Sequence, residues 1–163
     1  MKSSFYKKPS IIIVDDHLIF RQSLASLISI ENIGKVIGEA SDGEEFLNLL
    51  KFSVPDLVLM DIDMPKMNGM EATQRALKLH PMLKVIAFTM FGDLEYYNKM
   101  LELGVKGFLL KSSGINEVED AIDAVMKGKT YFSKSLPKST ITKLNLEIPQ
   151  EKDSGSNSPI PWW

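Results

Sequence analysis

The 163-residue chain contains no cysteine and only two histidines, His17 and His80. The absence of cysteine excludes disulfides, thiolate metal sites and thiol catalysis, and it agrees with a reducing, cytoplasmic location. Two histidines also make a zinc site unfavourable, because zinc sites are built from several nitrogen or sulfur ligands. Cross-links are not needed at this length, since folding buries roughly 70% of the surface of the extended chain.

The chain also lacks an excess of basic residues and a long hydrophobic run. Its 19 Lys and Arg against 21 Asp and Glu give a formal net charge of −2. Nucleic-acid binding requires a basic surface, so direct DNA binding by this chain is disfavoured. The N-terminal segment MKSSFYKKPS is followed by only four apolar residues before two aspartates, which is neither a signal peptide nor a membrane span.

Short apolar runs alternate with segments of helical periodicity over most of the chain. The expected strands are Ile11–Val14, Lys35–Gly38, Leu57–Met60, Val85–Phe88 and Gly107–Leu110. The expected helices are Leu18–Ile30, Glu44–Lys51, Met70–Leu79, Leu94–Leu103 and Ile115–Met126. Strands that are apolar at nearly every position are typical of a parallel sheet buried on both faces. The pattern therefore predicts a doubly wound α/β fold, with five parallel strands and helices on both faces.

The segment after Phe132 differs in composition from the rest of the chain. It contains four of the eight prolines and a cluster of Ser, Gly and Asn. We therefore expect a domain at residues 9–132 and a linker or mobile tail at 133–163. An alternative for part of this tail is that Trp162 and Trp163 anchor a partner.

Charged and hydroxyl side chains stand at the carboxyl ends of four expected strands. Asp15 and Asp16 follow the first strand, Asp61 the third, Thr89 the fourth and Lys111 the fifth. In an open parallel sheet these ends meet at one edge, where reactive groups collect. Taken singly, Asp16 is typical of a helix N-cap, Thr89 of a strand and Lys111 of a solvated charge. Their coincidence at one edge favours a functional site.

Three neighbouring carboxylates raise each other's pKa unless a cation neutralises them. Mg²⁺ is the expected ion, because it prefers oxygen ligands. When one carboxylate remains free to attack, the group becomes a phosphoryl-transfer site that forms an aspartyl phosphate. Mg²⁺ and an ammonium would then stabilise the phosphoryl oxygens.

Four segments resemble the receiver domains of two-component response regulators. They are IIIVDDH (Ile11–His17), LVLMDIDMPKMNGMEA (Leu57–Ala72), VIAFTM (Val85–Met90) and LGVKGFLLK (Leu103–Lys111). The resemblance spans about residues 10–128, and its string D-x-x-M-P-x-M-x-G is specific. It implies a flavodoxin-like strand order of 2-1-3-4-5.

The resemblance also implies the roles of the acidic residues. Asp61 is the phosphoacceptor, Asp15 and Asp16 help to bind Mg²⁺, and the backbone carbonyl of Asp63 completes the protein ligands. Asp61 is favoured over Asp63 as the nucleophile, because it directly follows a buried run and stands three residues before Met-Pro. His17 is an alternative ligand or phosphohistidine, although one histidine at the start of a helix is more typical of a polar surface residue.

The same resemblance implies a conformational switch. Thr89 is the switch hydroxyl, Lys111 the lysine that contacts the phosphoryl group, and Phe108 the aromatic residue whose rotamer changes with the switch. Ser112 follows Lys111 where the family often has proline, which is a local departure. The implied partners are a sensor histidine kinase or phosphotransfer protein and, after phosphorylation, a second copy of the chain.

The VDDH opening and the ending AVMKGKTYFS are most similar to the NarL/FixJ subgroup, which normally carries a LuxR-type helix-turn-helix output domain. No such domain follows in this sequence. We expect a receiver separated from its DNA-binding half, or else a stand-alone receiver. The expected function is transcription regulation, with DNA bound only through an output domain outside this chain.

Two alternatives belong to other functional classes. A haloacid-dehalogenase-type phosphatase would use Asp61 and Asp63, but in that family the D-x-D segment precedes the acidic pair, whereas Asp15 and Asp16 come first here. A receiver-like interaction module that no longer accepts phosphate is the other alternative. The favoured hypothesis is a phosphoacceptor domain that is not a turnover enzyme.

Overall fold

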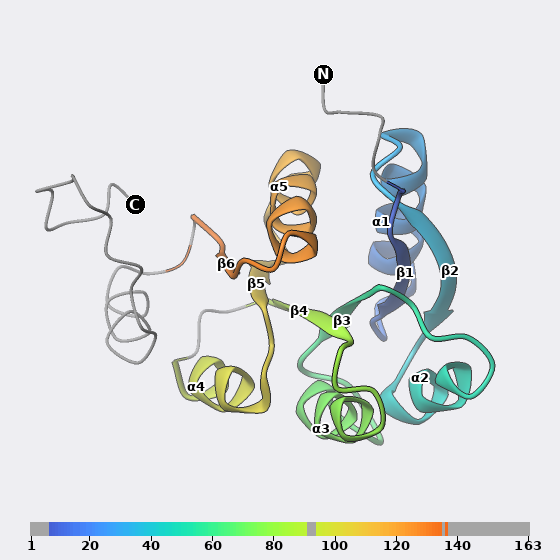
Figure 1. Ribbon diagram of the computed structural model, residues 1–163, viewed down its shortest axis with the longest axis vertical. Coiled ribbons are helices and arrows are strands. Elements are labelled where there is room, and N and C mark those ends of the chain that lie inside the picture. Colours follow the sequence, from blue (N-terminus) through green and yellow to red (C-terminus); the bar gives the residue numbers. More distant parts are fainter. Residues whose placement is uncertain (1–6, 91–93, 135, 137–163) are drawn as a thin grey trace, which may run out of the picture.

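The computed structural model describes residues 7–90, 94–134 and 136, in which strands and helices alternate (Figure 1). The strands are β1 (Ser10–Val14), β2 (Lys35–Ala40), β3 (Leu57–Asp61), β4 (Lys84–Thr89), β5 (Gly107–Leu110) and β6 (Tyr131–Phe132). The helices are α1 (Leu18–Ile30), α2 (Gly43–Leu50), α3 (Gly69–Leu79), α4 (Leu94–Leu103) and α5 (Ile115–Met126). The predicted alternation is confirmed, with most boundaries within two residues.

The strands form one sheet in the order β2-β1-β3-β4-β5-β6, and every neighbouring pair is parallel. The predicted α/β fold and the order 2-1-3-4-5 are confirmed. The structure adds β6, which pairs with β5 at the edge. Its two residues are too few to show strand periodicity in a sequence. The strand order reverses between β1 and β3, which is where a ligand site is expected in such a sheet.

Helices cover both faces of the sheet. Figure 1 shows α1 and α5 on one side, and α2, α3 and α4 on the other. Successive residues of a strand point to opposite faces. Ile11 and Ile13 accordingly pack in the core under α1 and α5, whereas Ile12 and Val14 pack in the core under the other three helices. All four are almost fully buried, which explains why the strand is apolar throughout.

The packed chain continues a few residues beyond Phe132. The backbone N–H of the buried Ser133 donates to the carbonyl of Phe108 at 2.8 Å, and Leu136 is also buried. Residues 137–163, which include Trp162 and Trp163, lie outside the described residues, and the prediction of a mobile tail falls mainly on them. In the described part of the chain, no helix has the length and apolar character needed to cross a membrane.

Candidate functional site

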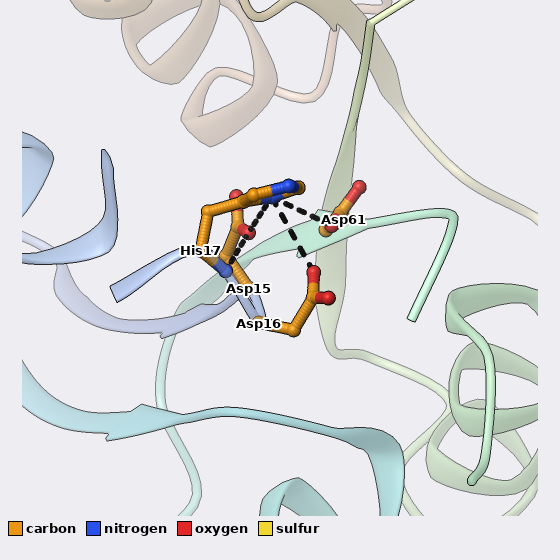
Figure 2. A group of neighbouring side chains, drawn as sticks. All are labelled: Asp15, Asp16, His17 and Asp61. Atoms are coloured by element: carbon orange, nitrogen blue, oxygen red, sulfur yellow. Dashed lines mark hydrogen bonds and ion pairs between the residues drawn. The ribbon is translucent and has the colours of Figure 1, made fainter. Parts of the chain in front are cut away.

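Three aspartates meet where the carboxyl ends of β1 and β3 lie side by side. Asp61 is the last residue of β3, and Asp15 and Asp16 directly follow β1. Together with His17, each offers one ligand atom, and these four atoms all lie within 4.8 Å of one another (Figure 2). Asp15 and Asp61 are buried, whereas Asp16 and His17 are exposed. The pocket therefore has a buried acidic floor and a rim that solvent reaches.

Lys111 provides the positive charge inside this pocket. Its ammonium Nζ lies 2.8 Å from Asp15 Oδ2 and 3.2 Å from Asp61 Oδ2. Only 5% of the lysine side chain is exposed, and Nζ lies 5.1 Å from the centre of the Phe20 ring. The backbone N–H of Lys111 donates to the carbonyl of Thr89 at 2.8 Å, and this hydrogen bond joins the ends of β4 and β5. The structure thus brings together the lysine and the two buried carboxylates that the sequence placed at this edge.

The Asp61 carboxyl is held in an environment that opposes its charge. Burial raises its pKa, the negative charge of Asp15 raises it further, and the resulting pKa is about 7. Lys111 lowers the pKa by its charge and its hydrogen bond, but it does not offset the other two effects. An added cation in the pocket would favour the ionised carboxylate. The site is therefore suited to a carboxylate that becomes reactive when a cation binds.

The close packing of α3 fixes the backbone at Asp61. The backbone N–H of Gly69, the first residue of α3, donates to the carbonyl of Ile62 at 2.9 Å. A Cβ atom on residue 69 would lie only 2.1 Å from the Asp61 carbonyl oxygen. Glycine is therefore required for α3 to start this close to the strand end. This contact gives a physical reason for the spacing between the aspartate and the glycine in D-x-x-M-P-x-M-x-G.

The two acids of Asp61-Ile62-Asp63 occupy different environments. Asp61 is only 3% exposed and belongs to the carboxylate cluster. The residue Asp63 is exposed, and its backbone N–H lies 3.4 Å from Asp61 Oδ1. Its side chain is not part of the four-residue cluster. This difference supports Asp61 as the candidate nucleophile, and the Asp63 carbonyl remains a predicted ligand.

His17, which the sequence offers as an alternative ligand, and Arg21, which was not predicted, both contact the acidic site. The His17 side chain is 58% exposed, as expected for the surface, but its Nδ1 lies 3.0 Å from Asp15 Oδ1. His17, and not Asp16, is the N-cap residue of α1. Arg21, one helical turn later, donates from Nη1 to the Asp15 carbonyl at 2.5 Å and from Nε to Glu39 Oε1 at 3.1 Å. Its position four residues after His17 was the available signal, because both side chains then share a helix face.

Comparison with known proteins identifies the family. The family model described as "Response regulator receiver domain" matches residues 11–123. The chain belongs to this family. It is 30% identical to the transcriptional regulatory protein DegU of Brevibacillus brevis, over 91% of this chain and 63% of that protein. It is 34% identical to the response regulator GacA of Pseudomonas protegens, over 82% of this chain and 62% of that protein.

The structure of this receiver is also similar to solved structures. A two-component response regulator of the LuxR family from Aurantimonas sp. SI85-9A1 has a TM-score of 0.78 at 30% identity, over 86% of this chain and 99% of that one. The resemblance to receivers with a LuxR-type output is thus confirmed. The chain spans about three fifths of the length of the first curated relatives that it matches.

In this receiver the residue predicted to change rotamer lies in an aromatic cluster. Phe108 is fully buried, its ring meets the Tyr97 ring edge-on at 4.7 Å, and it stacks on the Phe132 ring at 5.6 Å with an interplanar angle of 9°. Thr89 lies at the end of β4, which pairs with β5. The described conformation therefore has the aromatic ring turned inward. Tyr97 and Phe132 were not predicted, because neither lies near Phe108 in sequence.

Proposed function

We propose that this receiver accepts a phosphoryl group on Asp61 from a phosphohistidine of a sensor histidine kinase or phosphotransfer protein. The observation that carries the proposal is the pair of buried carboxylates, Asp15 and Asp61, bridged by the ammonium of Lys111 at 2.8 and 3.2 Å. The nearby Asp16 and the backbone carbonyl of Asp63 would help Asp15 and Asp61 to hold Mg²⁺. When bound, Mg²⁺ would neutralise charge on the phosphoryl oxygens.

The proposed reaction is a displacement at phosphorus. A carboxylate oxygen of Asp61 attacks the phosphorus atom, the P–N bond of the phosphohistidine breaks, and the imidazole leaves with the bonding electron pair. Lys111, already in the pocket, contributes positive charge beside the transferred group. The hydroxyl of Thr89 would donate a hydrogen bond to the product. The donor set is all oxygen apart from His17, which suits a hard divalent ion.

Phosphorylation would act through the charge that it adds. By analogy with other phosphorylated residues, an aspartyl phosphate carries about 1.5 to 2 negative charges, in place of the single charge of the free carboxylate, and it offers phosphoryl oxygens as further acceptors. Thr89 and Phe108 would respond, and the surface of α4, β5 and α5 would change. A reversal from 1:99 to 99:1 between two states requires roughly 5.5 kcal/mol. Charge-assisted hydrogen bonds from Lys111 and Thr89, with a metal contact, are of sufficient strength in sum.

The experiment that tests the proposal is intact-mass spectrometry after incubation with acetyl phosphate and Mg²⁺. We expect one added phosphoryl group on the wild-type chain and none on Asp61→Asn. Asp63→Asn is the matched control, because it removes an exposed acid two residues away, and it should still be phosphorylated. Equal labelling of Asp61→Asn and the wild type would contradict the proposal. Beryllofluoride with Mg²⁺ should mimic the product in the wild type and in Asp63→Asn, but not in Asp61→Asn.

The phosphatase alternative receives little support. It requires Asp61 and Asp63 to act together, yet the Asp63 side chain lies outside the acidic cluster. Membership in the receiver family also favours a domain that is modified once over an enzyme that turns over. Sustained hydrolysis of a generic phosphomonoester that is lost in Asp63→Asn would reverse this preference.

We further propose that the receiver regulates transcription and dimerises when phosphorylated. DegU of Brevibacillus brevis is named as a transcriptional regulatory protein, and its match to this chain supports the same role. DNA would be bound through an output domain, since the charge of this chain does not favour nucleic acid. Light scattering with and without beryllofluoride tests dimer formation. We expect the molar mass to rise only when beryllofluoride and Mg²⁺ are both present.

A further inference from the structure

The acidic pocket contains one nitrogen ligand besides its carboxylates. The Nδ1 atom of His17 lies 3.0 Å from Asp15 Oδ1, 3.4 Å from Asp16 Oδ1 and 4.0 Å from Asp61 Oδ2. Figure 2 shows the ring directed toward all three carboxylates. The four residues thus form a mixed nitrogen and oxygen group whose ligand atoms lie within 4.8 Å of one another.

The neighbours of Nδ1 are incompatible in either neutral form of the ring. If Nδ1 carries the proton, it donates to Asp15, but the N–H also faces the Lys111 ammonium at 2.9 Å. If Nδ1 is bare, it accepts from Lys111, but its lone pair faces the carboxylate oxygens of Asp15 and Asp16. In this structure the Lys111 ammonium is the cation that the lone pair shares with Asp15 and Asp61, so a metal ion bound to Nδ1 would take the place of this ammonium beside the ring.

The backbone holds His17 beside the pocket, and its ring lies at the exposed rim. Its N–H donates to Asp15 Oδ1 at 2.8 Å, and its carbonyl accepts from the N–H of Arg21 at 2.9 Å. The side chain is 58% exposed and makes no capping hydrogen bond. The ring can therefore adjust its angle toward an ion without disturbing the hydrophobic core.

We propose, on the basis of the metal pocket in the proposed function, that His17 is a metal ligand that determines ion preference. Imidazole nitrogen is a favourable ligand for Fe²⁺, Ni²⁺, Cu²⁺ and Zn²⁺, and affinities generally rise along the first-row series. Mg²⁺ prefers oxygen ligands and gains little from a nitrogen. His17 therefore raises the affinity of the pocket for first-row transition dications and leaves its affinity for Mg²⁺ nearly unchanged.

Cobalt(II) is a suitable probe, because it belongs to this series and its unpaired electrons shift the proton resonances of a bound imidazole. The binding of Co²⁺ and of Mg²⁺ is measured by calorimetry at about pH 8, where an ordinary imidazole is neutral. The proteins are the wild type, His17→Ala and His80→Ala. His80 is the matched control, because it is the other histidine of the chain and caps the end of α3.

We expect His17→Ala to lose roughly tenfold or more in Co²⁺ affinity, since even indirect partners of metal ligands contribute this much. Its Mg²⁺ affinity should stay within about twofold of the wild-type value. The wild type and His80→Ala should both show a shifted imidazole N–H resonance with Co²⁺, and His17→Ala should not. This resonance reports nitrogen ligation directly and does not depend on phosphorylation.

Two results would overturn the inference. If His17→Ala loses Co²⁺ and Mg²⁺ affinity equally, His17 only positions Asp15. If Co²⁺ affinity and the resonance are unchanged in His17→Ala, the nitrogen does not bind the ion. In both cases the proposed function stands as long as the wild type takes up one phosphoryl group with Mg²⁺. If the wild type binds neither ion and takes up no phosphoryl group, the proposed function fails and the inference fails with it.

Discussion

Replacing Asp61 by Asn tests how strongly the pocket opposes a buried charge. Burial and Asp15 raise the pKa of Asp61 from 3.8 to about 7. Below about pH 4 the carboxyl is neutral in the folded and unfolded chains, so it has no effect on the pH dependence of stability. Between about pH 4 and 7 only the folded chain keeps the proton, so stability falls as the pH rises. Above about pH 7 the carboxyl is ionised in both states, and the full loss of stability from its buried charge is present.

The size of the effect follows from these two pKa values. Each pH unit between them corresponds to about 1.4 kcal/mol. The interval from 3.8 to about 7 therefore sets an upper bound of roughly 4 kcal/mol. Water at the exposed rim beside Asp16 reduces this cost, and Asn loses the ion pair with Lys111. We expect Asp61→Asn to be more stable than the wild type by about 2 kcal/mol at about pH 8.

The assay is urea unfolding followed by circular dichroism, in EDTA, at about pH 5 and about pH 8. The advantage of Asp61→Asn should fall by at least half at the lower pH. Mg²⁺ should stabilise the wild type at about pH 8 and reduce the difference, because it binds the ionised pocket. The control, Asp63→Asn, removes an exposed acid and should show no such dependence. A difference that is the same at both pH values would contradict a raised pKa of Asp61.

Three further substitutions test the contacts around the site. Lys111→Ala leaves two buried carboxylates without their cation, so it should destabilise the fold by roughly 3 kcal/mol at about pH 8. The control is Lys127→Ala, which removes the exposed ion pair with Asp123 and should destabilise the fold by less than about 1 kcal/mol. Urea unfolding of the two variants measures the difference. Gly69→Ala places a methyl group 2.1 Å from the Asp61 carbonyl oxygen, so it should lower the stability by roughly 3 kcal/mol and abolish phosphorylation. The control, Gly114→Ala, places its methyl group in open space and should lower the stability by less than about 1 kcal/mol. Phe132→Ala removes the ring stacked at 5.6 Å and should lower the stability by roughly 2 kcal/mol, which thermal unfolding measures; no loss would contradict the packing of β6 as part of the core.

The order of elements and the identity of the charged residues could be predicted because they depend on local pattern. A continuous apolar run such as Ile11–Val14 indicates a strand buried on both faces. In a parallel sheet, the residues that follow such strands must share one edge. Asp15, Asp61 and Lys111 are therefore expected at the same edge from the sequence alone. The two-residue strand β6 could not be predicted in this way, because its pattern is too short.

Other features depend on distances between residues that are far apart in the chain. Phe132 stacks on Phe108 because β6 lies beside β5, and neither residue's local sequence contains that information. The Nδ1 atom of His17 enters the acidic cluster through a side-chain angle that only the surrounding groups decide. The raised pKa of Asp61 likewise results from packing, since burial and the approach of Asp15 arise only when β1 and β3 are paired. The periodicity of the strands and helices, and the charged groups that follow each strand, can be read from the local sequence. The distances between those groups and their exposure to water cannot, because both depend on packing across the whole sheet.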